Sequence, residues 1–227
     1  MYLLSLDLSQ NRIEGTRGGQ AIAKIIGRHI NKKGGVDIES INLSHNKLGD
    51  GGFCAINLEL LTPGSDLGTL NVAYNNISNI KLGIVLEAVS DKTYAVRKLR
   101  LDGNTFKNTT HHRLASLLNN ARKLSKISMV GCQLEDEGLV ITFEALSSLR
   151  EVRKIDYSNN SIFSKGIEGI CQYIGGAYRK SDLETIKLNS NDITDLGFMK
   201  LLEAIQNKPN KIKDLSFVSN DMTDEAA

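Results

Sequence analysis

Apolar and polar residues alternate in eight short segments that recur along the whole chain. The first segment, LLSLDLSQNRI, runs from Leu3 to Ile13, and the second, IESINLSHNKL, repeats its pattern of apolar positions. Successive side chains of a β-strand point to opposite faces, so this pattern predicts a short strand with one face buried and the other open. We therefore expect eight short strands, one in each segment.

A polar residue, almost always Asn, follows each predicted strand at a nearly fixed interval. Its side-chain amide can bind backbone groups that lose their partners where the strand turns away. Cys132 replaces Asn once, and we interpret this cysteine as structural rather than reactive. We call this the ladder position; successive spacings are 35, 29, 29, 28, 28, 31 and 29 residues, and it falls at Asn11, Asn46, Asn75, Asn104, Cys132, Asn160, Asn191 and Asn220.

The second half of each repeat predicts a helix. Apolar residues 7, 10, 11 and 14 positions after the ladder form one buried stripe, as in Phe198, Leu201, Leu202 and Ile205. Small residues six positions after the ladder, such as Gly52, predict that the start of each helix passes close to its neighbour. Every helix is expected to begin four positions after the ladder, at residue types favoured as N-caps: Gly15, Asp50, Asn79, Asn108, Asp136, Ser164, Asp195 and Asp224.

One repeat alone cannot bury both its strand face and its helix stripe, so the repeats must stack. Stacking predicts an α/β fold, a right-handed horseshoe-shaped solenoid with a concave parallel sheet and convex helices. We expect one domain over residues 1–227, and we expect the chain to be truncated at one or both ends because both ends of the stack expose apolar core.

The eight segments match the pattern LxxLxLxxNxL and resemble leucine-rich repeats over the whole chain. The period of 28 to 29 residues resembles the ribonuclease-inhibitor-like subfamily. This resemblance implies a full helix in every repeat and a concave face that binds another protein.

The composition is that of a folded protein, with 41% hydrophobic residues, and its formal net charge is only +2. The chain has no long run of like charges, so no charged tail that could bind nucleic acid is predicted. The three cysteines, Cys54, Cys132 and Cys171, lack CxxC spacing and indicate a reducing compartment. No apolar stretch is long enough to span a membrane. We predict a cytoplasmic location, in the protein's own cell or in a host cytosol if it is a secreted effector, and no membrane partner.

Charge on the concave face is uneven. The exposed strand positions of repeats one to three carry −2, from Asp7 and Glu39. Those of repeats four to seven carry +4, seven basic residues against three acidic ones. We expect an acidic protein surface to dock there, and the alternative is a solvated face balanced by local carboxylates. The basic residues are Arg97, Lys98, Arg100, Lys126, Arg153, Lys154 and Lys187, and the acidic ones are Asp102, Asp156 and Glu184.

Two rings occupy the same column of the concave face on neighbouring repeats, His45 and Tyr74. They either anchor a partner or pack against the neighbouring turn. His111 and His112 begin the fourth helix, where one must face inward and the other outward, and we interpret both as structural. We predict no metal, cofactor or catalytic residue, because the histidines lack metal-ligand spacing and no phosphate-binding loop or nucleophile motif occurs.

These observations predict a scaffold that binds a partner protein and acts as an inhibitor or regulator. A role as a bacterial effector is one form of this function. The alternative is a GTPase-activating protein resembling the Ran GTPase activators, for which Arg17, in the first repeat's turn, is the candidate arginine. Nucleic-acid binding is disfavoured because the basic strip lacks interleaved aromatic residues. No small-molecule substrate is indicated.

Overall fold

The computed structural model describes residues 3–29, 37–60, 67–78, 96–107, 111–176 and 182–223, and every structural statement below concerns these residues. Eight strands form one parallel sheet in chain order, each pairing with the next at the same repeat position, as in Ser5 with Ser40. The predicted register is therefore confirmed. The strands are β1 (Ser5–Asp7), β2 (Ser40–Asn42), β3 (Thr69–Asn71), β4 (Lys98–Arg100), β5 (Lys126–Ser128), β6 (Lys154–Asp156), β7 (Thr185–Lys187) and β8 (Asp214–Ser216).

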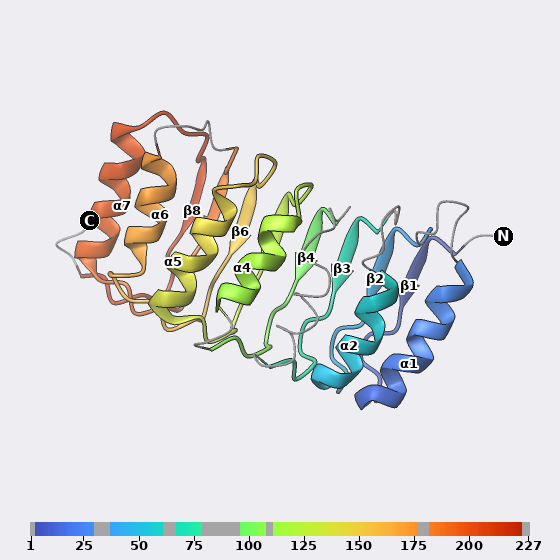
Figure 1. Cartoon of the computed structure of the whole chain (residues 1–227). Coiled ribbons are helices and arrows are strands. Elements are labelled where there is room, and N and C mark those ends of the chain that lie inside the picture. Colours follow the sequence, from blue (N-terminus) through green and yellow to red (C-terminus); the bar gives the residue numbers. More distant parts are fainter. Residues whose placement is uncertain are drawn as a thin grey trace.

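The helices stand side by side along one face of the sheet, and the two ends of the chain lie at opposite ends of the stack (Figure 1). This arrangement confirms the predicted α/β solenoid. The third helix, predicted around residues 82–89, lies outside the described residues, as do most of the loops before β2 and β7. The described helices are α1 (Gly15–Ile26), the 3-10 turn η1 (Gly27–His29), α2 (Gly49–Leu60), α4 (His111–Asn120), α5 (Glu135–Leu146), α6 (Ile167–Gly175) and α7 (Asp195–Asn207).

The core lies between the sheet and the helices, and the central residue of each strand points into it. Ile41, Leu99 and Ile155 are at most 6% exposed. The residues on either side of each central residue therefore face the open side of the sheet. These open positions are the ones that can meet a partner.

The ladder amides lie inside the turn that follows each strand, buried in the inner repeats, whereas Asn11 is exposed and Asn220 is half-buried. Asn104 donates from Nδ2 to the carbonyl oxygens of Val72 and Leu101, at 3.0 and 2.8 Å. Its Oδ1 accepts from the backbone N–H groups of Asn75 and Ile77, at 3.2 and 3.0 Å. One side chain thus joins two repeats. The predicted ladder is confirmed.

Cys132 performs only half of this role. Its Sγ lies 3.3 Å from the carbonyl oxygen of Leu101, so it replaces the donor of an asparagine. It has no equivalent of the amide oxygen, and the N–H of Phe106 donates instead to the backbone oxygen of Cys132 at 2.9 Å. Burial raises the pKa of Cys132 to about 12. The thiol therefore remains protonated at neutral pH, which agrees with a structural role.

The helix starts differ from the prediction in three repeats. Helices α1 and α7 begin four residues after the ladder, whereas α2 and α5 begin one residue earlier, at Gly49 and Glu135. Helix α6 begins at Ile167, three residues late, after a turn. A single start position for every helix is therefore wrong.

The predicted capping role is also wrong, because these side chains cap the following repeat rather than their own helix. Helices α1, α5, α6 and α7 have no side-chain cap. Instead, Asp50 accepts from the N–H and Oγ of Ser78, at 2.6 and 2.7 Å. Asp136 likewise accepts from the N–H groups of Phe163 and Gly166. The turn of the next repeat lies beside these helix starts, and its unpaired N–H groups donate to the Asp side chains there. Asn79, Asn108 and Asp224 lie outside the described residues.

The small residues near the helix starts do mark close approaches. A Cβ on Gly52 would lie 2.7 Å from the carbonyl oxygen of Gly15 in the preceding repeat. A Cβ on Gly197 would lie 2.9 Å from the Cα of Ser164. Neither backbone can move aside cheaply, so the predicted contact between neighbouring repeats is confirmed.

Candidate partner-binding surfaces

A row of three lysines crosses the open side of the sheet. Lys98 pairs in register with Lys126, and Lys126 with Lys154, on β4, β5 and β6. All three side chains are exposed, and neighbouring strands lie about 4.8 Å apart. Among the described residues, no carboxylate forms an ion pair with any of them. We call these three residues the lysine row.

The carboxylates expected to balance this face are engaged elsewhere. Asp102 is only 2% exposed and binds Arg100. Asp156 accepts from the N–H and Oγ of Ser158, at 3.3 and 2.7 Å. Glu184 pairs with Lys213 at 3.8 Å, outside the predicted basic set. Local neutralisation therefore does not extend to the lysine row.

The other basic residues flank the row. Arg97 and Arg153 precede β4 and β6, Lys187 ends β7, and all three are exposed. A hydrogen bond from Lys211 and its charge lower the pKa of Asp182, and Arg153 adds a weaker effect. Five of the seven predicted residues thus lie on neighbouring strands, and Arg97 and Arg153 lie directly before two of these strands. We call the seven together the basic surface: Arg97, Lys98, Arg100, Lys126, Arg153, Lys154 and Lys187.

Arg100 differs from the lysines because a buried carboxylate holds it. Its Nε and Nη2 lie 3.2 and 2.9 Å from Oδ2 of Asp102. The side chain of Arg100 is 58% exposed, whereas that of Asp102 is 3% exposed. The other oxygen, Oδ1, accepts from Ser128 Oγ at 2.6 Å and from the N–H of Val130 at 2.9 Å. Asp102 therefore links two repeats and orients one basic side chain.

Sequence reasoning counted Asp102 only as a charge and missed this role. In repeats one, two, three and six, the last strand residue is Asp or Asn and accepts the N–H two residues later, as Asn42 does from Ser44. In repeats four and seven that residue is basic, and Asp102 and Asn189, two positions later, accept instead from N–H groups of the following repeats, those of Val130 and Val218. The exchange of basic and acceptor positions is a signal that the sequence contains.

His45 and Tyr74 form a stacked pair, with ring centroids 4.5 Å apart and planes 13° from parallel. The residue before every ladder position has a positive φ, and these two have 55° and 53°. The next residue in the column is Gly103, where a Cβ would lie 2.2 Å from Cδ1 of Tyr74. The Tyr74 ring thus packs on the neighbouring turn, as one of the two alternatives predicts, while 45% of the residue remains exposed.

The two adjacent histidines face opposite ways, as predicted. His111 is 2% exposed and its Nε2 lies 3.1 Å from the carbonyl oxygen of Phe106, whereas His112 is exposed. Within the described ranges, no three His, Cys, Asp or Glu side chains are grouped so as to hold a metal ion. No described helix is long and apolar enough to cross a membrane. Arg17 is exposed on the first turn of α1, so its predicted place in a turn is wrong.

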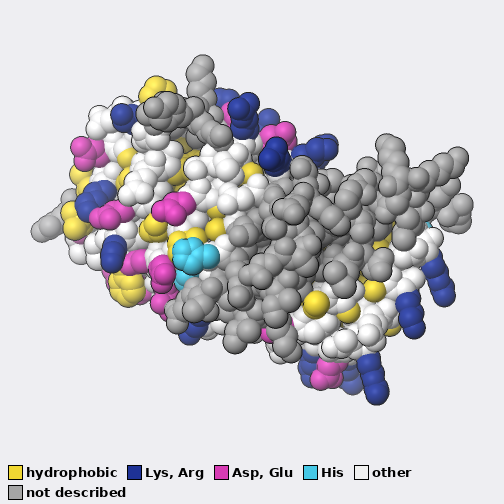
Figure 2. Space-filling model, viewed as in Figure 1, with side chains coloured by type: hydrophobic (Ala, Val, Ile, Leu, Met, Phe, Trp, Pro, Cys, Tyr) yellow, Lys and Arg dark blue, Asp and Glu magenta, His cyan; other side chains and the backbone are white. Residues whose placement is uncertain are grey.

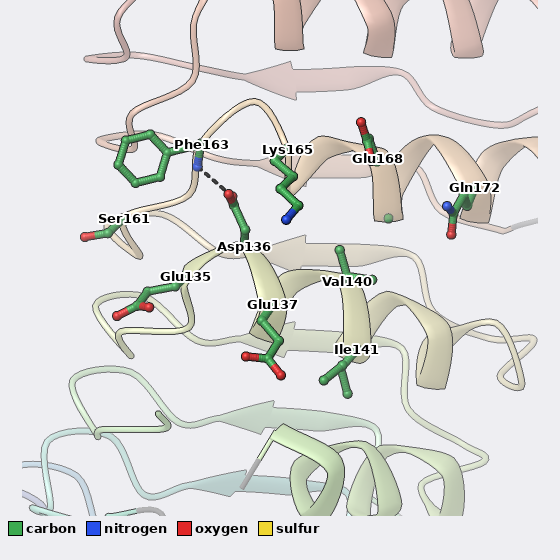
Figure 3. A pocket seen from close by; sticks show the side chains of 11 residues that line it. Glu135, Asp136, Glu137, Val140, Ile141, Ser161, Phe163, Lys165, Glu168 and Gln172 are labelled. Atoms are coloured by element: carbon green, nitrogen blue, oxygen red, sulfur yellow. Dashed lines mark hydrogen bonds between the residues drawn. The ribbon is translucent and has the colours of Figure 1, made fainter. Parts of the chain in front are cut away.

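A groove on the helical face is a second surface that sequence reasoning missed. It lies between α5 and α6, has a volume of about 730 Å³, and is floored by Val140 and Ile141 with Phe163 at one end (Figure 3). Figure 2 shows acidic side chains gathered over this part of the helical face. Phe163 is 54% exposed, and every other repeat has a polar residue or glycine at its position. That exception is the signal that could have located the groove.

Eight parallel strands backed by helices, with a long open sheet face, define a solenoid repeat protein. The chain is a leucine-rich repeat protein: eight ladder turns are present, and a leucine-rich repeat family model matches residues 1–23, 37–55 and 180–202. Proteins of this class typically bind other proteins along the open face. The finer assignment to the ribonuclease-inhibitor-like subfamily stays a prediction.

Individual proteins also match the chain. Over 70 residues it is 33% identical to human NLRC5, a match that spans 31% of this chain and 4% of the length of NLRC5. A crystal structure of an internalin from Listeria monocytogenes aligns with 98% of this chain and 82% of its own, at 12% identity and a TM-score of 0.27.

Proposed function

We propose that this protein binds an acidic surface of another protein through the basic surface of its concave face. The observation that carries the proposal is the lysine row. Like charges directly opposite each other on neighbouring strands destabilise a sheet. A partner that places carboxylates against Lys98, Lys126 and Lys154 would offset this repulsion, which no described carboxylate does.

The rigidity of the frame supports the proposal. Strand pairing and the buried ladder fix the spacing of the exposed residues before any partner arrives. A preformed surface loses little conformational entropy on binding, so more of the contact energy appears as affinity. The open face of a leucine-rich repeat protein is suited to this kind of recognition.

Charge at the other end of the face supports a defined orientation of the partner. Hydrogen bonds from Ser9 and Asn42 lower the pKa of Asp7, which keeps it anionic. Glu39 on the next repeat is exposed. A partner with an acidic and a basic end would therefore bind in one direction. The His45 and Tyr74 rings, on repeats two and three, would contact it beside this acidic end.

Charge reversal of the lysine row tests the proposal. The variant Lys98→Glu, Lys126→Glu, Lys154→Glu should lose its partner in affinity capture from nuclease-treated extracts of the source cells, and the purified pair should bind at least about 100-fold more weakly. The matched control is Lys24→Glu, Lys165→Glu, Lys200→Glu, which makes the same charge change at exposed sites on or beside the outer helices. Equal binding by the two variants would contradict the proposal.

A further inference from the structure

We propose that Arg100 is the carboxylate-binding subsite of the basic surface and that Asp102 is the residue that positions it. This inference rests on the proposed function, because it names the point where a partner's carboxylate is bound. The lysine row, in contrast, supplies positive charge without a fixed hydrogen-bonding geometry.

The geometry fixes Arg100 before a partner arrives. One edge of its guanidinium donates to Oδ2 of Asp102, at 3.2 Å from Nε and 2.9 Å from Nη2. Among the described residues, Asp102 is its only hydrogen-bond acceptor. Oδ1 of Asp102 is held in turn by Ser128 and Val130 of the next repeat. Asp102 itself is too deeply buried to meet a partner.

The remaining edge of the guanidinium suits a carboxylate. Arginine binds carboxylates through two parallel N–H bonds in a planar fork, which an ammonium group cannot do. The side chain is 58% exposed, so this edge is accessible. Because Asp102 already restricts the rotamers of Arg100, binding a carboxylate costs less conformational entropy than it would at the unrestrained lysines.

Repeat seven shows that the backbone does not require a charge at the position of Asp102. There the equivalent residue is Asn189, whose Oδ1 accepts from Ser216 Oγ at 2.7 Å and from the N–H of Val218 at 2.9 Å. These are the bonds that Asp102 makes to Ser128 and Val130. A neutral amide therefore satisfies the turn. The charge of Asp102 serves Arg100.

This precedent makes Asp102→Asn an informative variant. The amide can keep the bonds to repeat five, but it loses the charge that orients Arg100. The substitution also makes the basic surface more positive by one charge. A surface that works through net charge alone would bind an acidic ligand more tightly after this change, whereas a positioned Arg100 would bind it more weakly.

The probe is a fluorescein-labelled decaglutamate peptide, titrated by fluorescence anisotropy at about 50 mM and about 150 mM NaCl. We expect Asp102→Asn to weaken binding about 3- to 10-fold. The matched control is Asp156→Asn, which makes the same charge change at a residue that binds no basic side chain within the described ranges. It should tighten binding slightly.

Arg100→Lys provides a second variant that keeps the charge and removes the planar fork. It should weaken binding as much as Asp102→Asn, and the double variant should be no weaker than either single one. If Asp102→Asn and Arg100→Lys bind as tightly as the wild type while reversal of the lysine row abolishes binding, this inference is wrong and the basic surface stands. If reversal of the lysine row leaves peptide binding unchanged, the proposed function fails as well.

Discussion

Two rows of like side chains run from repeat to repeat, one in the turns after the strands and one on the open side of the sheet, and repetition has opposite effects in them. In the buried ladder, Asn104 accepts N–H groups of the preceding repeat and donates to carbonyl oxygens of that repeat and of its own. In the exposed lysine row, Lys98, Lys126 and Lys154 stand in register without a carboxylate partner among the described residues. An amide is both donor and acceptor, whereas an ammonium group is only a donor and carries charge.

The difference separates stability from recognition within a single repeat: the turn residue stabilises the frame and the strand residue faces the partner. Stacked amides satisfy the backbone groups of the turns around them, in their own repeat and in the preceding one, so each added repeat reinforces the frame. Stacked ammonium groups repel one another, so they persist at the expense of stability. A row that weakens the frame marks the surface where a partner is expected.

Breaking the ladder should have the largest effect. Asn160 is 1% exposed, donates to the carbonyl oxygen of Met129 at 2.7 Å, and accepts from the N–H groups of Cys132 and Leu134. Asn160→Ala leaves several buried backbone groups unpaired, and we expect a loss of about 3 to 5 kcal/mol in the free energy of unfolding. Urea denaturation followed by circular dichroism measures this loss.

Asn11→Ala is the matched control, because Asn11 is exposed and, in the part of the chain that the structure describes, its amide donates only within its own repeat. Its loss should be about 1 kcal/mol. Equal losses at the two positions would show that the ladder does not depend on burial between repeats.

The repeated pattern made much of this structure predictable. Strand register, the ladder and the exposed columns follow from the periodicity, because each repeat places the same position in the same environment. The basic surface was predictable for the same reason, because most of its residues occupy those exposed columns. The helix starts were not, because the turn of the next repeat lies over each of them and recruits residues such as Asp136.

The interaction between Arg100 and Asp102 also escaped prediction. Local rules describe Asp102 as a surface charge, since most carboxylates are exposed. Its burial depends on Ser128 and Val130 of the next repeat, where β5 ends in Ser128 rather than in Asp or Asn and Asp102 accepts the N–H of Val130 instead. Contacts between repeats can be predicted only by comparing neighbouring repeats column by column.

The pH dependence of stability tests the role of Cys132 in the ladder. Burial raises its pKa from about 8.5 in the unfolded chain to about 12 in the fold. The fold therefore favours the neutral thiol, and this contribution is complete below about pH 8.5 and lost as the pH rises toward 12. By about pH 10.5 the wild type should lose about 2 to 3 kcal/mol relative to Cys132→Ser. Urea denaturation across this range would contradict the prediction if the two profiles stayed parallel.

Restoring the ladder should have a smaller effect of opposite sign. In Cys132→Asn, Nδ2 can donate to the carbonyl oxygen of Leu101, and Oδ1 can accept the N–H of Phe106. We expect a gain of about 1 kcal/mol in the free energy of unfolding at pH 7. Cys132→Ala, which removes the existing donor to Leu101, should lose stability. A loss in both variants would show that the cysteine is adapted to its turn.

The smallest effect is expected in the lysine row. Lys126 lies between two lysines, so Lys126→Gln should relieve repulsion on both sides and raise the free energy of unfolding by about 0.3 to 0.5 kcal/mol. Lys24→Gln is the control of opposite sign, because Lys24 lies in the last turn of α1, where a positive charge stabilises the helix. Both effects should disappear at about 1 M NaCl. If Lys126→Gln lowers stability, the row is held by favourable contacts, and the contrast with the ladder is lost.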